Sequence, residues 1–362
     1  MIRRPPRSTQ GVSSAASDVY KRQFPIVAEE CTAVRERVGL LDISGFSRFQ
    51  VTGPNARTWL DHLMASRLPT PGRARLAPML APSGRLKGDL TLLNWGNGSW
   101  WIMGSYYLRQ WHMRWFQDHI EDGVKVHDIS DGIVGFGLAG PRSRDVLASL
   151  SHQDLSHEAL GFMGCAAVDV GLIRANVVRL SVCGELGYEI NCPAAEHITL
   201  RETLLEAGRS CDMREIGFYA LNSLRLEKSF GIWSAEFTQD RTPGMTGMDR
   251  WIDFEKQNFI GRSAALEEHD KGNPPQRLVT LEIDADDADA SSYEPVWQGD
   301  TRVGFTTSGG YGHHTDKSLA MALVDRAVPD DADLSVHVVG RRQGASIPVS
   351  YTHLTLPTIL LV

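Results

Sequence analysis

The sequence predicts an α+β fold in which two related α/β subdomains, residues 24–275, precede a C-terminal all-β, barrel-like domain, residues 276–348. Three observations lead to this prediction: an internal repeat, a change of hydrophobic periodicity near residue 276, and an ordinary globular composition. A chain of 362 residues with 42% hydrophobic and 22% charged residues is long enough for two or three domains with a large core.

The internal repeat defines the two α/β subdomains. The segment FSRFQVTGPNARTWLDHL at residues 46–63 aligns with IVGFGLAGPRSRDVLASL at residues 133–150, an offset of 87 residues. Each copy reads as a strand, a Gly turn, a Pro at the first helical position and a helix with inward-facing Leu. We therefore expect two similar, intertwined α/β units packed together.

The same repeat argues against a dinucleotide site. Residues 135–140 match the G-x-G-x-x-G pattern literally. The first copy, however, has Arg48 and Gln50 at the positions of Gly135 and Gly137, and Pro141 falls inside the helix that would face a pyrophosphate. We expect no nicotinamide or flavin site in this chain.

From residue 276 the pattern changes to short strands separated by Gly and Asp turns. Strands are expected at residues 278–283, 301–307, 319–324 and 334–339, and Gln298-Gly299-Asp300 has hairpin character. The stretch 271–276 is a plausible linker. This part is predicted to form a small barrel or sandwich.

Charge and cysteine usage exclude several classes of protein. A net charge of −7 argues against a nucleic-acid partner, and no apolar run approaches membrane-spanning length. The five cysteines are scattered without a CxxC pair, which suits a reducing compartment and offers neither a zinc site nor a disulfide framework. We expect a cytoplasmic protein without a metal site.

The two chain ends differ from the middle. Residues 1–23 and 349–362 resemble translated sequencing-adaptor read-through, and the first of them has no apolar segment of a secretory signal. We therefore leave both out of the fold argument. If they are scars, the natural reading frame can continue at either end, and a further domain can be missing.

Three charged residues stand out because they lie in regular, partly apolar segments. Asp89 heads the strand-like run LTLL, although Asp is a poor strand residue; it could equally form a surface ion pair with Lys87 two positions before it. Glu189 follows Tyr188 out of the turn GELG, where it could also be a solvated hairpin residue. Arg225 lies beside a helical stripe of Leu and could simply pair with a neighbouring carboxylate.

These segments together resemble the folate-binding aminomethyltransferase family, which comprises the glycine-cleavage T-protein and the C-terminal halves of dimethylglycine and sarcosine dehydrogenases. The matching segments, spread in order over residues 24–348, are GLLDIS (39–44), MLAPSGRLKGDL (79–90), GELGYEI (184–190), LNSLRLEKSF (221–230), FIGR (259–262) and TSGGYG (307–312). Gly45, where T-proteins usually have His, and the element GYGHH at 310–314 favour the dehydrogenase branch and put a lipoyl-carrier partner in doubt.

The resemblance implies a site for tetrahydrofolate in a central hole between the domains. It implies that Asp89 is the catalytic carboxylate beside the reactive nitrogens and that Glu189 holds the pterin. Arg225 would bind the folate or orient Glu189, and Tyr188 would stack on the ring, unless it is a core tyrosine. Trp233 and Glu236 follow the Arg225 helix in the sequence and are weaker candidates for lining the site.

The function implied by the resemblance is capture of formaldehyde, or of an iminium from an N-methyl amine, as 5,10-methylenetetrahydrofolate. Its partners would be the folate, a one-carbon donor and a flavin dehydrogenase domain or subunit; FAD would sit only on such an upstream domain. The alternatives are a stand-alone aminomethyltransferase, a folate-dependent demethylase and, outside enzymes, a folate-binding iron–sulfur assembly factor. The stretch KQNFIGR at 256–262 lacks the cysteine of the assembly factors.

Overall fold

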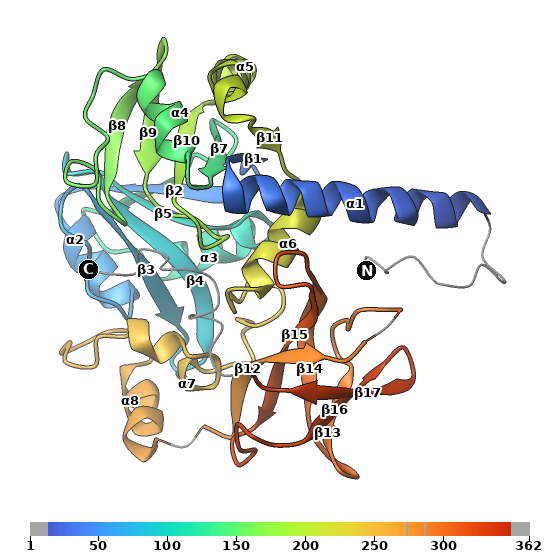
Figure 1. The fold of residues 1–362 in the computed structure, drawn as a ribbon. Coiled ribbons are helices and arrows are strands. Elements are labelled where there is room, and N and C mark those ends of the chain that lie inside the picture. Colours follow the sequence, from blue (N-terminus) through green and yellow to red (C-terminus); the bar gives the residue numbers. More distant parts are fainter. Residues whose placement is uncertain (1–13, 273, 286, 349–362) are drawn as a thin grey trace.

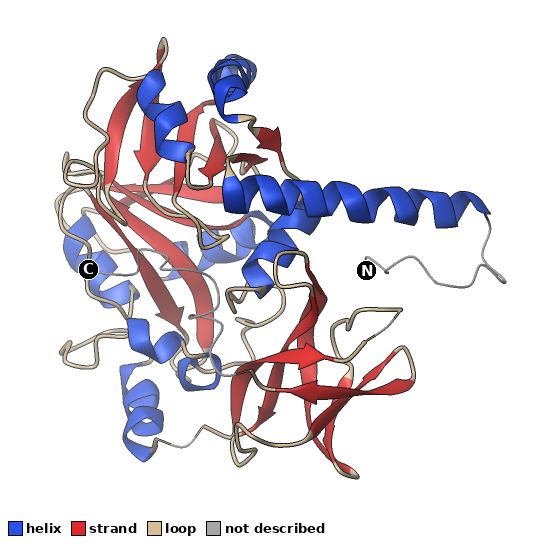
Figure 2. Cartoon of the chain, viewed as in Figure 1, coloured by secondary structure: helices blue, strands red, loops and turns tan. Residues whose placement is uncertain are grey.

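The fold is that of a computed structural model, which describes residues 14–272, 274–285 and 287–348. Two β-sheets lie close together in one half of the molecule and a barrel forms the other half (Figure 1). Most helices lie on the outer sides of the two sheets, and the long helix α1 (Ser14–Glu36) projects to one side (Figure 2). The predicted α+β class is confirmed.

The first sheet has five antiparallel strands in the order β3-β4-β5-β2-β6. Its outer face packs against helices α2 and α3 through a core that includes Phe49, Trp59, Leu90 and Phe116. The elements are β2 (Phe46–Thr52), α2 (Ala56–Leu63), β3 (Arg73–Leu80), β4 (Leu86–Asn94), β5 (Trp100–Ser105), the 3₁₀ turn η1 (Tyr106–Leu108), α3 (Arg109–Asp118) and β6 (Lys125–Asp128).

The second sheet has six strands in the order β11-β1-β7-β10-β9-β8. Helices α4 and α5 cover its outer face through residues such as Leu138, Leu147, Ile190 and Leu204. The elements are β1 (Gly39–Asp42), β7 (Ile133–Ala139), α4 (Ser143–Ser149), β8 (Cys165–Val170), β9 (Ile173–Val178), β10 (Gly187–Pro193), η2 (Ala194–Glu196), α5 (His197–Gly208), η3 (Arg209–Cys211) and β11 (Arg214–Glu215). Because β1 precedes the first sheet in the chain but pairs with β7, the two subdomains are intertwined.

The internal repeat is borne out element by element. Strand β2 and helix α2 form one copy, and strand β7 and helix α4 form the other, each in its own sheet. The shared Gly turn has a physical reason: Gly53 has φ +114° and Gly140 has φ +134°, and a Cβ there would lie 2.1 Å and 2.4 Å from a backbone oxygen. Only glycine fits this turn in either copy.

The inner faces of the two sheets pack against each other. The residues that join them include Leu93 and Trp101 from the first sheet and Cys165 and Val178 from the second. Side chains alternate between the two faces of a strand. Residues that lie two or four positions from one of these four on the same strand therefore also point between the sheets. This inner layer contains the candidate site.

The C-terminal domain is a closed barrel of six antiparallel strands in the order β12-β15-β14-β13-β16-β17, which confirms the barrel-like prediction. The predicted hairpin at residues 298–300 is present, because Gln298 pairs with Thr301. The strands are β12 (Gln276–Ile283), β13 (Pro295–Gln298), β14 (Thr301–Gly312), β15 (Lys317–Asp325), β16 (Leu334–Val338) and β17 (Arg341–Ser346).

Four short elements connect the sheets to the barrel: α6 (Phe218–Leu226), α7 (Pro243–Thr246), η4 (Met248–Trp251) and α8 (Arg262–Lys271). Arg35 of α1 also ties the parts together, since its guanidinium donates to Glu185 at 2.8 Å and to Glu227 at 2.8 Å. The expected boundary after residue 23 lies inside α1. Of the two expected tails, residues 1–13 and 349–362 lie outside the described residues.

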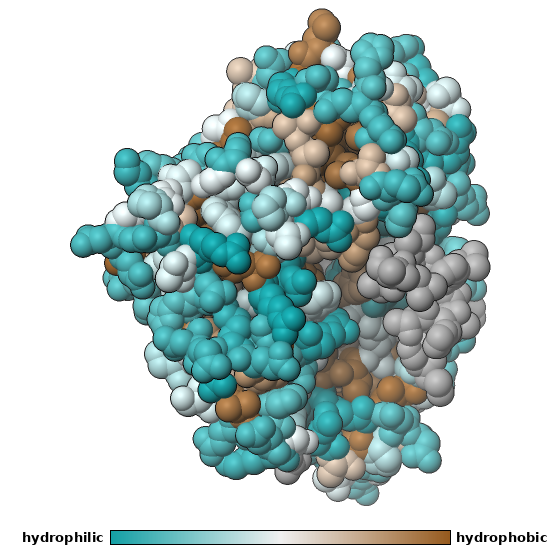
Figure 3. Space-filling view, turned by 90° about the vertical axis from the view of Figure 1, so that its left-hand side faces the viewer, coloured by the Kyte–Doolittle hydropathy of each residue, from teal (hydrophilic) through white to brown (hydrophobic). Residues whose placement is uncertain are grey.

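The surface is mostly hydrophilic on the face drawn in Figure 3, where hydrophobic residues are scattered among polar ones. Among the helices of the described part, none is long and apolar enough to cross a membrane. All five cysteines are buried and carry free thiols.

Candidate functional site

Asp89 lies in the middle of strand β4, on the inner face of the first sheet. Leu90 and Leu92 point to the helices on the outer face, so Asp89 points the other way, in step with Leu93 between the sheets. The Pro-Ser-Gly turn before β4 and the pairing of β4 with β3 and β5 fix this position. The strand therefore holds a carboxylate rigidly in the inner layer.

A β-bulge explains why Asp89 does not pair with Lys87. The register of β4 against β3 shifts so that Gly88 faces Met79 but Leu86 faces Leu80, which leaves Lys87 as the extra residue. The bulge turns Lys87 toward the outer face, where its ammonium lies 3.8 Å from the ring centroid of Trp111. The ion pair considered from the sequence is not formed.

The environment of Asp89 favours its neutral form. Burial raises the pKa of this carboxyl to about 7, opposed only by a hydrogen bond from its own backbone amide. The phenol of Tyr107 in η1 lies close enough for the Asp89 charge to raise its pKa, after the larger effect of burial. A carboxyl that titrates near neutrality can exchange a proton during a reaction.

Glu189 lies on strand β10, on the inner face of the second sheet. Its cross-strand neighbours are Val178 on β9 and Gly137 on β7, and the side chain of Ile43 lies beside Gly137. The residue is 7% exposed, and burial raises its pKa to about 7 while the charge of Arg48 lowers it. Glu189 is thus a buried acid whose ionised form is disfavoured by desolvation and favoured by the charge of Arg48.

Asp89 and Glu189 therefore lie on facing sheets, both directed into the inner layer. Within the described residues, neither carboxylate forms an ion pair or a side-chain hydrogen bond. Glu189 is buried and Asp89 is partly buried, and desolvated carboxylates normally have partners because desolvation without compensation is costly. The structure brings these two predicted residues to the same layer and leaves both free to bind something else.

Tyr188 lies on the opposite side of the same strand. Its ring is fully buried in the outer core with Leu138 and Ile190, and its hydroxyl accepts a hydrogen bond from Nε of Arg144 at 3.0 Å. Successive strand residues point to opposite faces, so Tyr188 cannot share the face of Glu189. The structure favours the core-tyrosine reading.

Arg225 lies near the end of α6 and is 3% exposed. Its guanidinium pairs with Glu236 at 3.2 Å and donates to Oδ1 of Asn222 at 2.8 Å. Glu236 in turn accepts from the hydroxyls of Thr307 and Ser308, each at 2.6 Å. Arg225 and Glu236 thus join α6 to the barrel, and the structure does not bring Arg225 to Glu189.

Trp233 is 5% exposed and packs in a core between the first sheet and the connecting helices. Its ring centroid lies 5.9 Å from that of Trp111 and 6.4 Å from the ring of His112. Its ring packs behind β4, and its role in lining a folate site stays a prediction.

Two further residues near the carboxylates were not predicted. His112 of α3 is buried against Gly88, and its Nε2 lies 3.2 Å from the carbonyl oxygen of Lys87 at the bulge. Burial lowers its pKa to about 4, so the imidazole is neutral and donates from Nε2. The other is Arg48, a buried cation on β2 whose charge acts on Glu189. The internal repeat contained the information that could have identified Arg48, because it aligns this charged residue with Gly135 of the second copy.

The literal dinucleotide pattern has a packing explanation. Gly135 and Gly137 lie within strand β7 and do not form a loop before a helix. A Cβ at Gly135 would lie 2.4 Å from the carbonyl oxygen of Ile190 on β10. Close approach of two strands requires this glycine.

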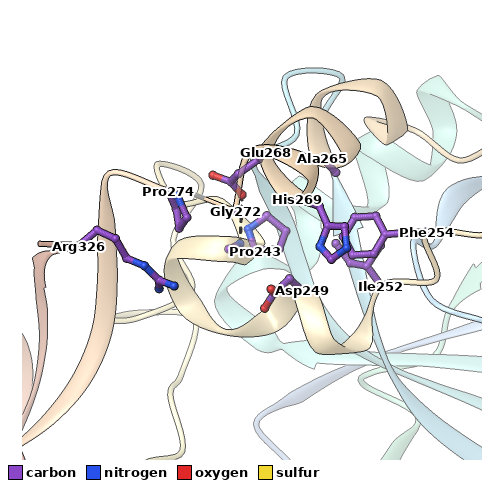
Figure 4. A pocket seen from close by; sticks show the side chains of 11 residues that line it. Pro243, Asp249, Ile252, Phe254, Ala265, Glu268, His269, Gly272, Pro274 and Arg326 are labelled. Atoms are coloured by element: carbon purple, nitrogen blue, oxygen red, sulfur yellow. Dashed lines mark hydrogen bonds between the residues drawn. The ribbon is translucent and has the colours of Figure 1, made fainter. Parts of the chain in front are cut away.

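A separate pocket of about 250 Å³ lies between α7, η4, α8 and the barrel (Figure 4). Glu268 accepts a hydrogen bond from the amide of Gly244 at 3.2 Å there, and the rings of Phe254 and His269 are stacked 4.0 Å apart. None of the predicted site residues lines it. Among the residues with described positions, no group of three His, Cys, Asp or Glu side chains is arranged to hold a metal.

Comparison with known families gives two matches that cover most of the chain. The GCVT N-terminal domain matches residues 9–256, and the glycine cleavage T-protein C-terminal barrel domain matches residues 276–351. The first match includes both carboxylates and both sheets. The second covers the six-stranded barrel.

Individual relatives fall into two groups. Mitochondrial dimethylglycine dehydrogenase of Rattus norvegicus is 33% identical over 340 residues, which is 92% of this chain but 40% of the relative. Aminomethyltransferase of Anoxybacillus flavithermus is 29% identical over 330 residues, which is 90% of each protein. The chain thus spans about two fifths of the length of the dehydrogenases it matches.

A solved structure agrees with the architecture. The glycine cleavage system aminomethyltransferase T from Bartonella henselae superposes with a TM-score of 0.80 at 25% identity, and the match covers 90% of this chain and 89% of that one. Sequence, fold and the two family matches lead to one conclusion. This chain is an aminomethyltransferase-like module that belongs to the glycine cleavage T-protein family.

Proposed function

We propose that this chain binds tetrahydrofolate in the inner layer between its two sheets and transfers a one-carbon unit to it. The observation that carries the proposal is the pair of desolvated carboxylates, Asp89 and Glu189, which face each other's sheet without partners among the described residues. Binding groups that are kept unpaired in the free protein are typical of a ligand site.

Glu189 suits the pterin end of the folate. An ionised carboxylate accepts two parallel hydrogen bonds, which matches a ring N–H beside an exocyclic amino group. We assign Glu189 as the pterin-binding residue.

Asp89 suits the reacting end. Tetrahydrofolate supplies the two amine nitrogens that take up the one-carbon unit. In a water-poor layer, the Asp89 carboxylate stabilises positive charge that develops beside it and accepts the proton that an amine nitrogen loses. A pKa of about 7 is suited to this exchange at neutral pH, because both forms of the carboxyl are populated.

The finer proposal is that the one-carbon unit arrives as formaldehyde, or as an iminium, from oxidation of an N-methyl amine of the dimethylglycine or sarcosine type. Identity to dimethylglycine dehydrogenases, at 32–33%, exceeds identity to aminomethyltransferases, at 27–29%. The product would be 5,10-methylenetetrahydrofolate. A flavin dehydrogenase domain or subunit would be the partner that makes the electrophile.

A second candidate is a stand-alone aminomethyltransferase. The observation that favours it is the fold, which superposes on the glycine cleavage system aminomethyltransferase T from Bartonella henselae with a TM-score of 0.80. Supplying the chain and tetrahydrofolate with formaldehyde, or with an aminomethylated lipoyl carrier, separates the two. Faster methylene transfer from the carrier alone would favour the second candidate.

The proposal is tested by titrating the chain with tetrahydrofolate under anaerobic conditions. Loss of two charge-assisted hydrogen bonds should weaken binding of Glu189→Ala by about 10- to 100-fold. Asp89→Asn should bind normally and mainly slow the formation of the methylene product. Glu267→Ala, on the exposed face of α8, is the control and should match the parent. Unchanged affinity and turnover in both site variants would overturn the assignment.

A further inference from the structure

Arg48 is a buried cation whose hydrogen bonds all go to neutral acceptors. Its side chain is fully buried on β2 and points between the sheets. Its nitrogens donate to the carbonyl oxygens of Phe46 and Ile43, each at 3.0 Å, and to Oδ1 of Asn191 at 2.8 Å. No described carboxylate lies within ion-pair distance of it.

The guanidinium is fixed next to Glu189. Asn191 lies two residues after Glu189 on β10, so both side chains share the inner face of the second sheet. The bond to Asn191 therefore places the Arg48 charge beside the Glu189 carboxylate, across the gap between the sheets. Among the charged groups that act on Arg48, Glu189 has the largest effect.

We propose that Arg48 is a positioning residue that favours the ionised form of Glu189 while leaving both carboxylate oxygens free for the donors of a bound pterin. This inference rests on the proposed function. It adds a specific electrostatic role for a residue on the opposite sheet, outside the segments from which the site was predicted.

The physical reason is that the charge of Arg48 acts on Glu189, whereas its hydrogen bonds go to other groups. A guanidinium that formed a bidentate pair with Glu189 would occupy the oxygens that a pterin needs. Three of the five N–H groups of Arg48 donate to two carbonyl oxygens and an amide oxygen, and none of its hydrogen bonds goes to Glu189, so Arg48 acts on Glu189 through its charge. An ionised Glu189 accepts two hydrogen bonds, whereas a protonated one presents a hydroxyl donor toward the donors of the ligand.

Few other titratable groups act on this pair. The cross-strand neighbours of Glu189 are Val178 and Gly137, which carry no charge. Asp42, which lies 3.3 Å from Nε2 of His197, and Cys192 act on Arg48. Burial raises the pKa of the Cys192 thiol to about 11, so it is uncharged near neutral pH. The charge of Arg48 is thus the main opposition to protonation of Glu189.

The test compares Arg48→Gln with Arg48→Lys. Gln is neutral but still donates to the carbonyl oxygens, whereas Lys keeps the charge and loses the planar fork. The probe is 5-formyltetrahydrofolate, a stable reduced folate, and its affinity is measured by calorimetry from pH 6 to 9. Thermal unfolding of each variant confirms that it is folded.

For Arg48→Gln we expect affinity at pH 7 to fall about tenfold and to recover toward pH 9, because the pKa of Glu189 rises by about one unit or more. Arg48→Lys should keep the pH profile of the parent, with affinity within about threefold. A flat or parental profile in Arg48→Gln would overturn the inference. So would a binding profile of Arg48→Lys that is shifted to higher pH than that of the parent by about one unit or more, and this comparison decides the question even if Arg48→Gln does not fold.

A second readout needs no folate. Infrared difference spectra between each protein and its Glu189→Gln counterpart give the carbonyl band of protonated Glu189. This band should be stronger at pH 7 in Arg48→Gln than in the parent, and equal bands would overturn the inference. If the parent fails to bind the folate, the proposed function falls, while the infrared comparison still decides the role of Arg48.

Discussion

The Glu189 carboxylate should reduce the stability of the ligand-free protein above neutral pH. Its pKa rises from 4.5 in the unfolded chain to about 7 in the folded protein because burial disfavours the charge. The folded state therefore binds more protons than the unfolded state between these values, and the free energy of unfolding falls as pH rises through this window. The loss is complete above pH 7.

The magnitude follows from the displacement of the pKa. Each pH unit is worth about 1.4 kcal/mol, so the full cost is about 3 kcal/mol at pH 8 and close to zero below pH 4.5. Glu189→Gln removes the ionisable group and keeps the shape. We expect the variant to be more stable than the parent by about 2 to 3 kcal/mol at pH 8 and by less than about 1 kcal/mol at pH 5.

The assay is urea unfolding followed by circular dichroism at pH 5 and pH 8. Asp89, whose pKa also rises to about 7, remains in both proteins, so only the difference between their curves reports on Glu189. Glu267→Gln is the control: this exposed carboxylate pairs with Lys271, which lowers its pKa, so its loss should give no stabilisation at pH 8. Equal stability of parent and Glu189→Gln at both pH values would refute the reasoning.

Three other predictions concern stability. Glu236→Leu should cost about 3 to 5 kcal/mol, because it leaves the buried Arg225 charge unpaired, and adding Arg225→Leu should recover part of the loss in chemical denaturation. Val339→Asn should raise the free energy of unfolding by about 1 kcal/mol, since Val339 holds φ +49° in a two-residue hairpin turn that favours Asn-Gly; no gain in the melting temperature would count against this. Gly140→Ala should destabilise by about 2 kcal/mol or more in the same assay, because its Cβ would lie 2.4 Å from a backbone oxygen; a neutral effect would contradict the described turn.

The architecture was predictable because its signals are local. The repeat at residues 46–63 and 133–150 requires the same strand, the same positive-φ glycine and the same helix start in both copies, and the structure has them. In the short strands after residue 276, apolar and polar residues alternate, and only a β domain can bury the apolar side of such a pattern. In both cases, spacing along the chain is enough to specify the element.

The candidate site was predictable in part. Asp89 and Glu189 stood out because each lies in a partly apolar segment, but only the family resemblance assigned them to a folate site; the structure places both in the inner layer. For Tyr188, the strand pattern in the sequence could have been used. Adjacent strand residues face opposite sides, so Tyr188 and Glu189 cannot both face one ligand. The ligand-binding roles themselves stay predictions.

The remaining features depend on contacts between distant segments. The sequence alone determined the two strand–helix units, the barrel and the two unusual carboxylates, because periodicity and residue type are local properties. Only the tertiary structure decided that a bulge turns Lys87 away from Asp89, that Glu236 neutralises Arg225, and that Arg48 from the other sheet lies beside Glu189. Desolvation and pairing depend on what packs against a charge, and residues 11 to 143 positions apart supply those neighbours here.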